Sequence, residues 1–598
     1  MAIAIGALAA LVAAALLKLI ALFTNLFFFQ RWGTAFLSPA SNALGPLEIL
    51  VPVAGALIIG SLARYGSERI RGHGIPEALE AILIHGSRVQ PRVAILKPIS
   101  AAISIGSGGP FGAEGPIIMT GGALGSIVGQ MFHLTSAERK TLLVAGAAAG
   151  MSATFAAPIA SVLLAVELLL FELKPRSLIP VSLASATAMA MRHVLLGPGP
   201  IFPVPIHAPF TGSKGLAGCV LLGLLSGLVA ALMTLSVYAA EDLFKRLPIH
   251  WMWWPAIGGL AVGLGGFICP GALGVGYETI DGLLRGALPV KEILLLIVVK
   301  WIIWSIALGS GTSGGVLAPL LMIGSALGGL MALVLPGEGA GCWALISMGA
   351  ILGGMMRSPL TGVIFAAELT GDHGMLLPLL VASSVAHGLS VLTMKRSILT
   401  EKVARRGYHM TREYCVDPLE VAFVRDVMDT CVIGIPAAFS TDEAATFLNQ
   451  EDGGRNRLYP IVEPDGQLAG VVTRWRLKHW VKETGTSEGV HTVRQIATLT
   501  PVTAHPDEPL HIAVHRMSET GRTRLPVVSR DNHRRVLGMI SLAHTLEAKR
   551  RHVEEEWRRE RVLPISVLLP AFLRPPWLRR ATSERNGKPM PANDGDGS

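Results

Sequence analysis

The chain has 598 residues, which is room for more than one domain, and its formal net charge is +9. Hydrophobic residues make up 51% of it, charged residues only 16%, and the mean hydropathy is +0.52, which excludes an ordinary soluble protein. The first 395 residues hold 21 Lys and Arg and 16 Asp and Glu, whereas the last 203 hold 30 and 26. We therefore expect a polytopic membrane region followed by a soluble region, and no segment is basic enough to predict nucleic-acid binding.

The first apolar run starts at Met1, contains Lys18 and ends near Phe29, without the cleavage pattern of a signal peptide. We expect a membrane helix here, which the start of the chain could cut short. Residues Leu216–Ala239 predict another spanning helix, and Ile293–Leu308 a shorter one. No metal site is expected, because the cysteines lack the spacing of metal ligands; they are Cys219, Cys269, Cys342, Cys415 and Cys431.

Glycine is unusually frequent, at 67 residues, and many glycines interrupt apolar stretches. The segment Gly106–Gly125 aligns with Gly309–Gly328 at an offset of 203, with ten of twenty positions identical. Downstream, Ala157–Leu168 aligns with Ser358–Leu369 at an offset of 201. Two collinear matches at nearly the same offset indicate an internal repeat.

A membrane protein made of two similar halves, each with an apolar segment interrupted by glycine and proline, has the pattern of transporters built from structural repeats. In such proteins the substrate binds near the midplane, where discontinuous helices present N-terminal N–H groups that suit an anion. The glycines would then let backbone amides approach an ion. The alternative is that they only allow helices to pack closely.

Three short motifs resemble the loops at helix N-termini of the CLC family of chloride channels and chloride/proton antiporters. They read Gly72-His73-Gly74-Ile75-Pro76, Gly112-Ala113-Glu114-Gly115-Pro116 and Gly315-Val316-Leu317-Ala318-Pro319. The resemblance covers residues 10 to 407. It implies an all-α polytopic membrane domain with two inverted repeats, a homodimer, and one pathway per subunit for chloride or a similar anion. The residues that it assigns to the anion are His73, Gly74, Ile75, Gly115, Val316, Leu317 and Leu399.

Glu114 is a carboxylate in an apolar, glycine-rich segment, where a charge is costly and indicates a functional residue. The resemblance implies a gate: the ionised side chain occupies an anion position at helix N-termini, and the protonated side chain swings away so that an anion can enter. A carboxylate and a halide can compete for the same helix dipoles. The alternative is a carboxylate that only caps a helix.

His73 stands where the family has a serine at the central ion, and Leu399 stands where it has a tyrosine. If His73 faces the ion, its neutral imidazole can donate one N–H, whereas the protonated form would bring a positive charge. A helix-capping role for His73 stays open. Leu317 replaces a phenylalanine whose backbone N–H the family uses, so we expect little effect there. The preferred anion does not follow from the resemblance.

Antiporters of the family carry a proton-transfer glutamate, and the matching position here is Leu168, directly after Glu167. Leucine cannot carry a proton, so the sequence favours passive chloride conduction that Glu114 gates and that voltage or pH modulates. Proton-coupled chloride/proton exchange is the alternative, with a water chain or Glu167 in place of the missing glutamate. We expect Glu167 to be structural, because its repeat mate Glu368 could tie down a helix end in the same way.

After Gly407 the charge density rises and strand-like alternation begins. Tyr459-Pro460-Ile461-Val462 recurs as Leu525-Pro526-Val527-Val528, which resembles a tandem pair of α/β CBS domains, the regulatory module of many CLC proteins. We assign residues 1–407 to the membrane domain, 408–419 to a linker, 420–485 and 486–548 to the two CBS domains, and 549–598 to a charged helix and a disordered tail.

The resemblance to CBS pairs also bears on cofactors, since such pairs often bind adenine nucleotides through a Thr or Ser and an Asp three residues later. Thr473 is followed at that distance by Arg476, and Ser541 by His544, so neither repeat keeps the aspartate. Arg476 could still meet a phosphate. We expect no required cofactor and a module that stabilises a dimer without a ligand.

An enzyme is the remaining alternative. Gly311-Thr312-Ser313-Gly314 fits the motif of rhomboid intramembrane serine proteases, and His387 could serve as the base. Ser313 lies inside the internal repeat, and the pattern is easily met in a glycine-rich chain, so we expect no enzyme. The resemblance to the CLC family implies a multi-pass protein of a bacterial inner membrane, with the CBS domains in the cytoplasm.

Overall fold

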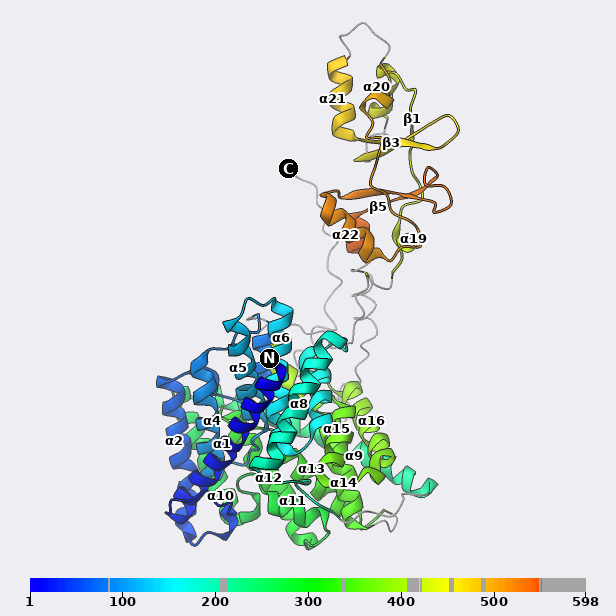
Figure 1. Ribbon diagram of the computed structural model, residues 1–598. Coiled ribbons are helices and arrows are strands. Elements are labelled where there is room, and N and C mark those ends of the chain that lie inside the picture. The colour runs from blue at the N-terminus through cyan, green and yellow to red at the C-terminus, as the bar shows by residue number, and fades with distance from the viewer. Residues whose placement is uncertain are drawn as a thin grey trace. The chain divides into compact units, whose positions relative to one another are not determined.

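The computed structural model describes residues 1–83, 86–204, 212–335, 339–405, 419, 422–450, 457–484, 491–547 and 550. It divides into two compact units, the first within Met1–Thr411 and the second within Arg412–Arg561 (Figure 1). Apart from Leu419, the predicted linker 408–419 lies outside the described residues, and apart from Arg550 so does the predicted charged helix and tail at 549–598.

The first unit is mainly helical, and its second half repeats the helix order of its first half. The helices of the first half are α1 (Ala2–Phe29), α2 (Leu50–Tyr65), α3 (Ile75–Leu83), α4 (Pro91–Gly106), α5 (Glu114–Met131), α6 (Ser136–Phe155), α7 (Pro158–Leu164) and α8 (Pro175–Leu195). Those of the second half are α9 (Ser213–Phe244), α10 (Trp254–Ile268), α11 (Tyr277–Leu284), α12 (Val290–Gly309), α13 (Leu317–Met331), α14 (Ala340–Met356), α15 (Pro359–Thr370), α16 (Leu376–Thr393) and α17 (Ile398–Arg405). The first residues of α5 and α13 are 203 positions apart, as the sequence repeat predicts.

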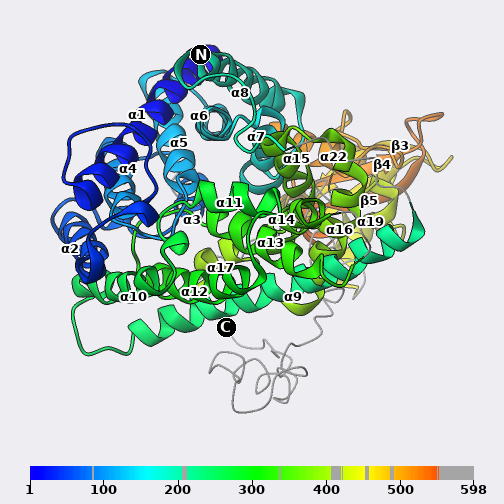
Figure 2. The same ribbon diagram turned by 90° about the horizontal axis from the view of Figure 1, so that it is seen from below.

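Short helical turns connect several of these helices. They are η1 (Pro39–Ser41), η2 (Gly45–Ile49), η3 (Glu68–Ile70), η5 (Trp251–Trp253), η6 (Pro270–Ala272), η7 (His373–Met375) and the π-helical segment η4 (Ala165–Leu170). Seen from below, the blue and cyan helices of the first half lie beside the green helices of the second, with α10 packed against α2 (Figure 2).

Seven of the described helical segments are long and apolar enough to cross a membrane. They are Ala2–Phe29, Gly45–Tyr65, Pro175–Leu195, Ser213–Phe244, Trp251–Ile268, Val290–Gly309 and His373–Arg405. Between them lie shorter apolar helices, such as α13, as expected where a span is broken inside the membrane. The first unit is therefore a multi-pass membrane domain, and both predicted spanning runs, Leu216–Ala239 and Ile293–Leu308, fall within its helices.

The core of the membrane domain lies where α5 packs on α6 and α13 packs on α14. Every residue of Cys342–Met356 in α14 is buried, so this helix is apolar around its whole circumference. A Cβ added to Gly121 of α5 would lie 2.3 Å from the carbonyl oxygen of Gly146 in α6. At these helix contacts, the glycines serve close packing, which is the alternative left open by the sequence.

The two halves are related by a local two-fold axis, because each contacts the other in the same way. Glu368 accepts the backbone N–H of Ala160 at 2.8 Å, at the start of α7. Its repeat mate Glu167 accepts the backbone N–H of Thr361 at 3.0 Å, at the start of α15. The contact that the second repeat makes with the first is thus matched by the same contact from the first repeat to the second, which indicates two-fold symmetry. The prediction that Glu167 ties down a helix end is confirmed.

The second unit also contains a repeat. Its strands are β1 (Ile435–Pro436), β2 (Leu458–Val462), β3 (Leu468–Thr473), β4 (Arg524–Val528) and β5 (Val536–Ser541), and its helical segments are α19 (Val424–Val427), α20 (Thr441–Asn449), α21 (Arg474–Thr484), α22 (Leu510–Thr520) and η8 (Val493–Ile496). Strand β2 pairs antiparallel with β3, placing Pro460 opposite Val471, and β4 pairs with β5, placing Pro526 opposite Met539. The recurring proline therefore takes the same place in both hairpins, as the sequence repeat predicts.

Candidate functional site

The three predicted motif loops meet inside the membrane domain. Gly112 and Gly315 are repeat mates, and the Gly315 N–H donates to the Gly112 carbonyl oxygen at 2.9 Å while the Gly112 N–H donates back at 3.5 Å. The N–H of Gly314 donates to the carbonyl oxygen of Gly72 at 3.4 Å. The local two-fold axis thus passes between the second and third loops, and the first loop is bonded to the third.

Glu114 lies at this crossing and is fully buried. Its Oε1 accepts the N–H of Ala318, in the first turn of α13, at 2.5 Å, and Oε2 has no hydrogen-bond partner among the described residues. A Cβ added to Gly112 would lie 1.9 Å from Oε2, and one added to Gly315 would lie 2.2 Å from it. Glycine is therefore required at both positions for the carboxylate to lie here. The contact crosses from α5 to α13, so Glu114 is not simply a cap of its own helix.

The loop of His73 packs against the start of α5. Gly72 and Gly74 have φ values of 93° and 90°, a left-handed conformation that favours glycine. A Cβ added to Gly115 would lie 1.7 Å from the His73 carbonyl oxygen, so the first and second motifs are in direct contact. The N–H of Gly74, the residue before α3, donates to Glu77 Oε2 at 2.7 Å. The helix-capping role of His73 stays a prediction. His73 is only 4% exposed, and its Nδ1 has no partner among the described residues.

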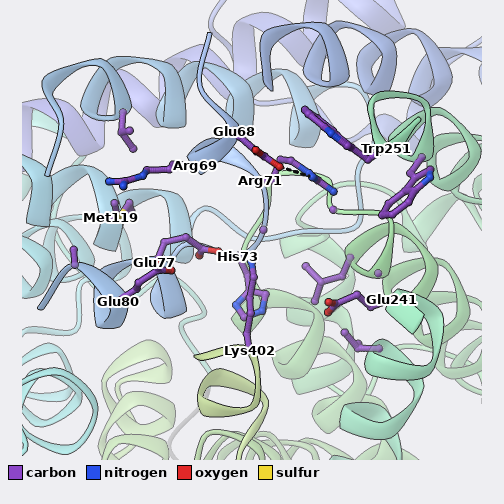
Figure 3. Close-up of a pocket in the computed structure, with 18 of the residues that line it drawn as sticks. Glu68, Arg69, Arg71, His73, Glu77, Glu80, Met119, Glu241, Trp251 and Lys402 are labelled. Carbon is purple, nitrogen blue, oxygen red and sulfur yellow. Dashed lines mark hydrogen bonds and ion pairs between the residues drawn. The ribbon is translucent and has the colours of Figure 1, made fainter. Parts of the chain in front are cut away.

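A cavity of about 510 Å³ reaches His73 (Figure 3). Glu77 forms an ion pair with Lys402 of α17 at the wall of this cavity. On another wall, the guanidinium of Arg71 lies 4.4 Å from the ring centroid of Trp251, a cation–π contact. Charged groups of both signs therefore line the approach to His73, which suits water and ions better than an apolar ligand.

The other residues predicted at the anion lie at helix starts. Ile75 begins α3, Gly115 is the second residue of α5, and Leu317 begins α13 with Val316 before it. All four are buried. The first N–H groups of a helix have no acceptor within that helix, so each of these starts can offer donors to an anion.

Leu399 is the second residue of α17 and is fully buried. The helix α17 packs against α3, which follows the His73 loop. Next to Leu399, the carbonyl oxygen of Ile398 accepts the hydroxyl of Tyr238 at 2.5 Å, and Tyr238 also lines the cavity. A tyrosine thus lies beside the predicted position of Leu399, and sequence reasoning missed it because Tyr238 comes from α9, far along the chain.

Two buried lysines were also missed. Lys97 in α4 and Lys300 in α12 are both 0% exposed, and each donates to carbonyl oxygens of a neighbouring loop. The two lysines are 203 positions apart, so they are repeat mates. Extending the repeat alignment upstream of Gly106 would have paired them.

Leu168 lies in the π-helical segment η4 and is fully buried. Segments of this kind are rare and often occur at functional sites. The neighbouring Glu167 is bonded to the start of α15, including the hydroxyl of Thr361 at 2.6 Å. The position that the resemblance matches to a proton-transfer glutamate is therefore apolar, and the adjacent carboxylate of Glu167 holds a helix end.

The residues predicted for a nucleotide lie at equivalent places in the two CBS repeats. Thr473 Oγ1 accepts the backbone N–H of Arg476 at 3.3 Å, and Ser541 Oγ accepts that of His544, also at 3.3 Å. Both hydroxyls therefore bond the turn that follows their strand. This contact gives each hydroxyl a structural role without a ligand.

Ser313, the nucleophile of the protease alternative, lies in the cluster of motif loops. Its Oγ accepts the hydroxyl of Ser100 at 3.1 Å, and its backbone forms a bridge with Gly72. His387 lies on α16. Ser313 is thus a part of the wall that joins the first and third loops.

Family models match both units. The model described as voltage gated chloride channel matches residues 54–391, and the CBS domain model matches residues 424–483 and 493–551. The H⁺/Cl⁻ exchange transporter ClcA of Salmonella arizonae is 31% identical over 437 residues, which cover 68% of this chain and 89% of that protein. A ClcB-like protein of Ralstonia nicotianae with a provisional chloride-channel name is 29% identical, covering 60% of this chain and 86% of that protein.

Solved structures share the fold. A slow cyanobacterial Cl⁻/H⁺ antiporter superposes with a TM-score of 0.60 at 22% identity, covering 68% of this chain and 96% of that one. A eukaryotic CLC transporter superposes with a TM-score of 0.56 at 16% identity, covering 91% of this chain and 97% of that one. With the repeat, the three motif loops and these matches, the chain belongs to the voltage-gated chloride channel (CLC) family and carries a C-terminal pair of CBS domains.

Proposed function

We propose that the protein moves chloride across the membrane in exchange for protons, and that both ions use Glu114. The observation that carries this proposal is the contact of Glu114 with the N–H of Ala318 at the start of α13. A helix N-terminus is a site for an anion, so the ionised carboxylate and chloride compete for it. Protonation removes the negative charge of Glu114 and frees the position for chloride.

Exchange is favoured over passive conduction by the relatives of the chain. The ClcA proteins, at 31% identity over most of their length, are named H⁺/Cl⁻ exchange transporters. The same relatives support chloride as the anion. This evidence from the family outweighs the single substitution at Leu168, which favours passive conduction in the sequence.

Exchange needs a proton route to Glu114 that does not use residue 168. The cavity that reaches His73 supports such a route, because Glu77 and Glu80 line it and its mixed charges favour water. His73 and Glu114 flank Gly115, so this route ends beside the gate. Water in the cavity can deliver a proton to Glu114 without a dedicated glutamate.

Passive, Glu114-gated conduction is the second candidate, and Leu168 is the observation that favours it. The side chain is buried and has no atom that binds a proton. The two candidates share the gate and the anion. They differ in whether the movement of chloride drives protons.

Full-length protein in chloride-loaded liposomes distinguishes the candidates, with potassium and valinomycin carrying the balancing charge and no initial pH gradient. Exchange predicts that chloride efflux drives protons into the liposomes, so that the external pH rises until an uncoupler is added. Glu114→Gln is the matched variant, and we expect it to move chloride without moving protons. Chloride efflux at constant external pH in the unmodified protein would contradict exchange and support passive conduction.

We propose further that two copies form a homodimer in a bacterial inner membrane, with the CBS units in the cytoplasm. Ile159 on α7 is 60% exposed and Leu360 on α15 is 48% exposed, and the reciprocal contacts of Glu167 and Glu368 hold these two helix starts together. Such an apolar face suits a second copy. In a variant whose own cysteines are replaced by serine, we expect Ile159→Cys to form a dimeric cross-link on oxidation, and Leu221→Cys, on α9, to remain monomeric.

For the CBS unit we propose a stabilising role without a required nucleotide. The local bonds of the Thr473 and Ser541 hydroxyls support it. Millimolar ATP should then leave the melting temperature of the full chain unchanged, whereas binding to the folded state would raise it.

A further inference from the structure

The side chain of Arg71 joins the two repeats at the wall of the cavity that reaches His73. Arg71 directly precedes the first motif loop, and its guanidinium lies 4.4 Å from the ring centroid of Trp251 and 5.9 Å from that of Trp254. The two tryptophans come from the second repeat, in η5 and at the start of α10. All three residues line the cavity. The guanidinium is therefore held beside the approach to the first motif loop.

The same guanidinium lies against the segment that leads into the third motif loop. A Cβ added to Gly311 would lie 2.7 Å from Nη2 of Arg71, so a side chain at position 311 would displace the guanidinium. Gly311 has a φ of 82°, which also favours glycine, and it lines the cavity too. One positive charge thus lies beside the chain segments that lead into two of the motif loops.

The counter-charge of Arg71 lies on the side of the solvent. Glu68 Oε1 is 3.2 Å from Nη1 of Arg71, and in Figure 3 Arg71 lies between Glu68 and Trp251. The Glu68 side chain is 66% exposed, whereas that of Arg71 is 20% exposed. Water therefore screens the carboxylate more than the guanidinium, which keeps its charge at every pH at which the protein is folded.

Two further ion pairs of this cavity have the opposite arrangement. Glu77 is the more buried partner of Lys402, with side-chain exposures of 9% and 21%. Glu241 is the more buried partner of Lys245, with exposures of 26% and 50%. Among these three pairs, only that of Arg71 places its cation on the buried side. Low-dielectric walls strengthen the field of such a charge inside a cleft.

We propose that Arg71 recruits the transported anion: its guanidinium, held on the ring of Trp251, attracts chloride from solution into the cavity. The proposal rests on the proposed function, in which chloride binds at the motif loops that this cavity reaches. Trp251 keeps the long side chain against the wall, so that its charge attracts chloride without occupying the passage. Arg71 is thus a positioning residue for the anion, and it acts before chloride meets the N–H groups of the helix starts.

Tracer exchange of chloride in liposomes tests the proposal, with equal chloride on both sides and gluconate keeping the ionic strength constant. We expect Arg71→Gln to lower the rate at low chloride by about three- to tenfold and to change the maximal rate by less than about twofold. Arg71→Lys keeps the charge and should retain most of the rate at low chloride. Lys245→Gln is the matched control from the same cavity, and its rate at low chloride should stay within about twofold of the unmodified protein.

The ionic strength gives a readout that a purely structural role of Arg71 would not change. Salt screens an attraction that acts through solvent, so raising sodium gluconate from roughly 50 mM to roughly 500 mM should bring Arg71→Gln to within about twofold of the unmodified protein at low chloride. An equal loss at both ionic strengths, or a loss of the maximal rate alone, would overturn the proposal. So would an Arg71→Lys protein that is as slow at low chloride as Arg71→Gln.

The partner carboxylate predicts a change of opposite sign. In Glu68→Gln the guanidinium loses its exposed counter-charge, so the rate at low chloride and low ionic strength should rise, by up to about twofold. Because Glu68 is exposed, this variant should fold even if Arg71→Gln does not. A lower rate at low chloride in Glu68→Gln would contradict the recruiting role of Arg71.

Proton movement in the same liposomes separates this proposal from the proposed function. Chloride movement without proton movement in the unmodified protein would contradict exchange, and the rates of the Arg71 variants would still decide the role of Arg71. Normal proton coupling, together with an unchanged rate at low chloride in Arg71→Gln, would contradict only the role of Arg71. If the unmodified protein moves no chloride, both proposals fail.

Discussion

The two repeats of the membrane domain hold their helices with the same residue types and differ where their helix starts meet. Glu167 and Glu368 each hold the first turn of a helix in the other repeat, and Gly112 and Gly315 bond to each other across the two-fold axis. At the start of α5, by contrast, the first repeat has Glu114, whereas the second repeat has Leu317 at the start of α13. A symmetric scaffold thus carries an asymmetric site, and in the proposed mechanism one helix start supplies the gate and the other the place where the gate binds.

Removing that asymmetry should have the largest effect. In Glu114→Gln neither repeat carries an ionisable group at its helix start, so chloride flux should vary by less than about twofold between about pH 4.5 and 7.5. Leu317→Met is the matched control at the repeat mate, and its flux should keep the pH dependence of the unmodified protein. Flux measured in liposomes decides this, and an unchanged pH dependence in Glu114→Gln would remove Glu114 as the gate.

Substitution of Gly315, which is bonded to Gly112 at the two-fold axis, should have the next largest effect. A Cβ at Gly315 would lie 2.2 Å from Glu114 Oε2 and 2.6 Å from the Gly112 carbonyl oxygen, so Gly315→Ala should expel the carboxylate or unfold the site. We expect flux that no longer falls at high pH, or protein that elutes as an aggregate. Gly388→Ala is the control, because nothing lies within 4 Å of its added Cβ. Normal gating in Gly315→Ala would contradict the position assigned to Glu114.

Because Glu167 and Glu368 make the same contact in the two repeats, their substitution should have equal effects. Glu167→Gln and Glu368→Gln each weaken the bonds at one helix start, so each should destabilise the domain by about 1 to 2 kcal/mol. The two melting temperatures should agree closely, and proton coupling should survive in both. A loss of coupling in Glu167→Gln alone would instead identify Glu167 as a proton carrier.

The two CBS repeats also differ at one matching carboxylate, Glu443 in the first and Glu508 in the second. Burial of the Glu508 carboxyl raises its pKa. The hydrogen bonds from Arg516 and from the N–H of His505 lower the pKa by more than burial raises it, so it lies below its ordinary value. Its counterpart Glu443 is exposed and accepts hydrogen bonds from the N–H and the hydroxyl of Ser440. The contribution of Glu508 to stability is therefore present above about pH 4.5 and lost as the pH falls through the lowered pKa.

We accordingly expect Glu508→Gln to lower the melting temperature of the second unit at neutral pH, and the difference from the unmodified protein to shrink in acid. Glu443→Gln should have a smaller effect at neutral pH because the side chain is solvated. Thermal unfolding of the full chain at two pH values measures both variants. A loss of stability in Glu508→Gln that is the same in acid would show that the ion pair with Arg516 is not its cause.

Local patterns predicted most of the scaffold. The repeat placed the starts of α5 and α13, and the motifs at Gly72, Gly112 and Gly315 identified loops that do lie together, because glycine in an apolar segment signals close backbone approach. The reciprocal roles of Glu167 and Glu368 also followed from their alignment.

The features that could not be predicted from the sequence are contacts between segments that lie far apart in the chain. Lys300 interrupts an apolar run, and nothing near it in sequence shows that its ammonium group donates to the carbonyl oxygens of Ala272 and Gly274. Tyr238 comes from α9, yet its hydroxyl reaches Ile398. The cavity beside His73 could not be predicted either, since its walls come from both repeats.

The central claim is that the Glu114 carboxylate occupies the place of the anion. Anomalous diffraction from crystals grown in bromide tests it most directly, in the unmodified protein and in Glu114→Gln. We predict a bromide peak within hydrogen-bond distance of the Ala318 N–H in the variant and none there in the unmodified protein while the carboxylate is in place. A variant without that peak, or a bromide ion bound to Ala318 beside an undisplaced Glu114, would contradict the claim.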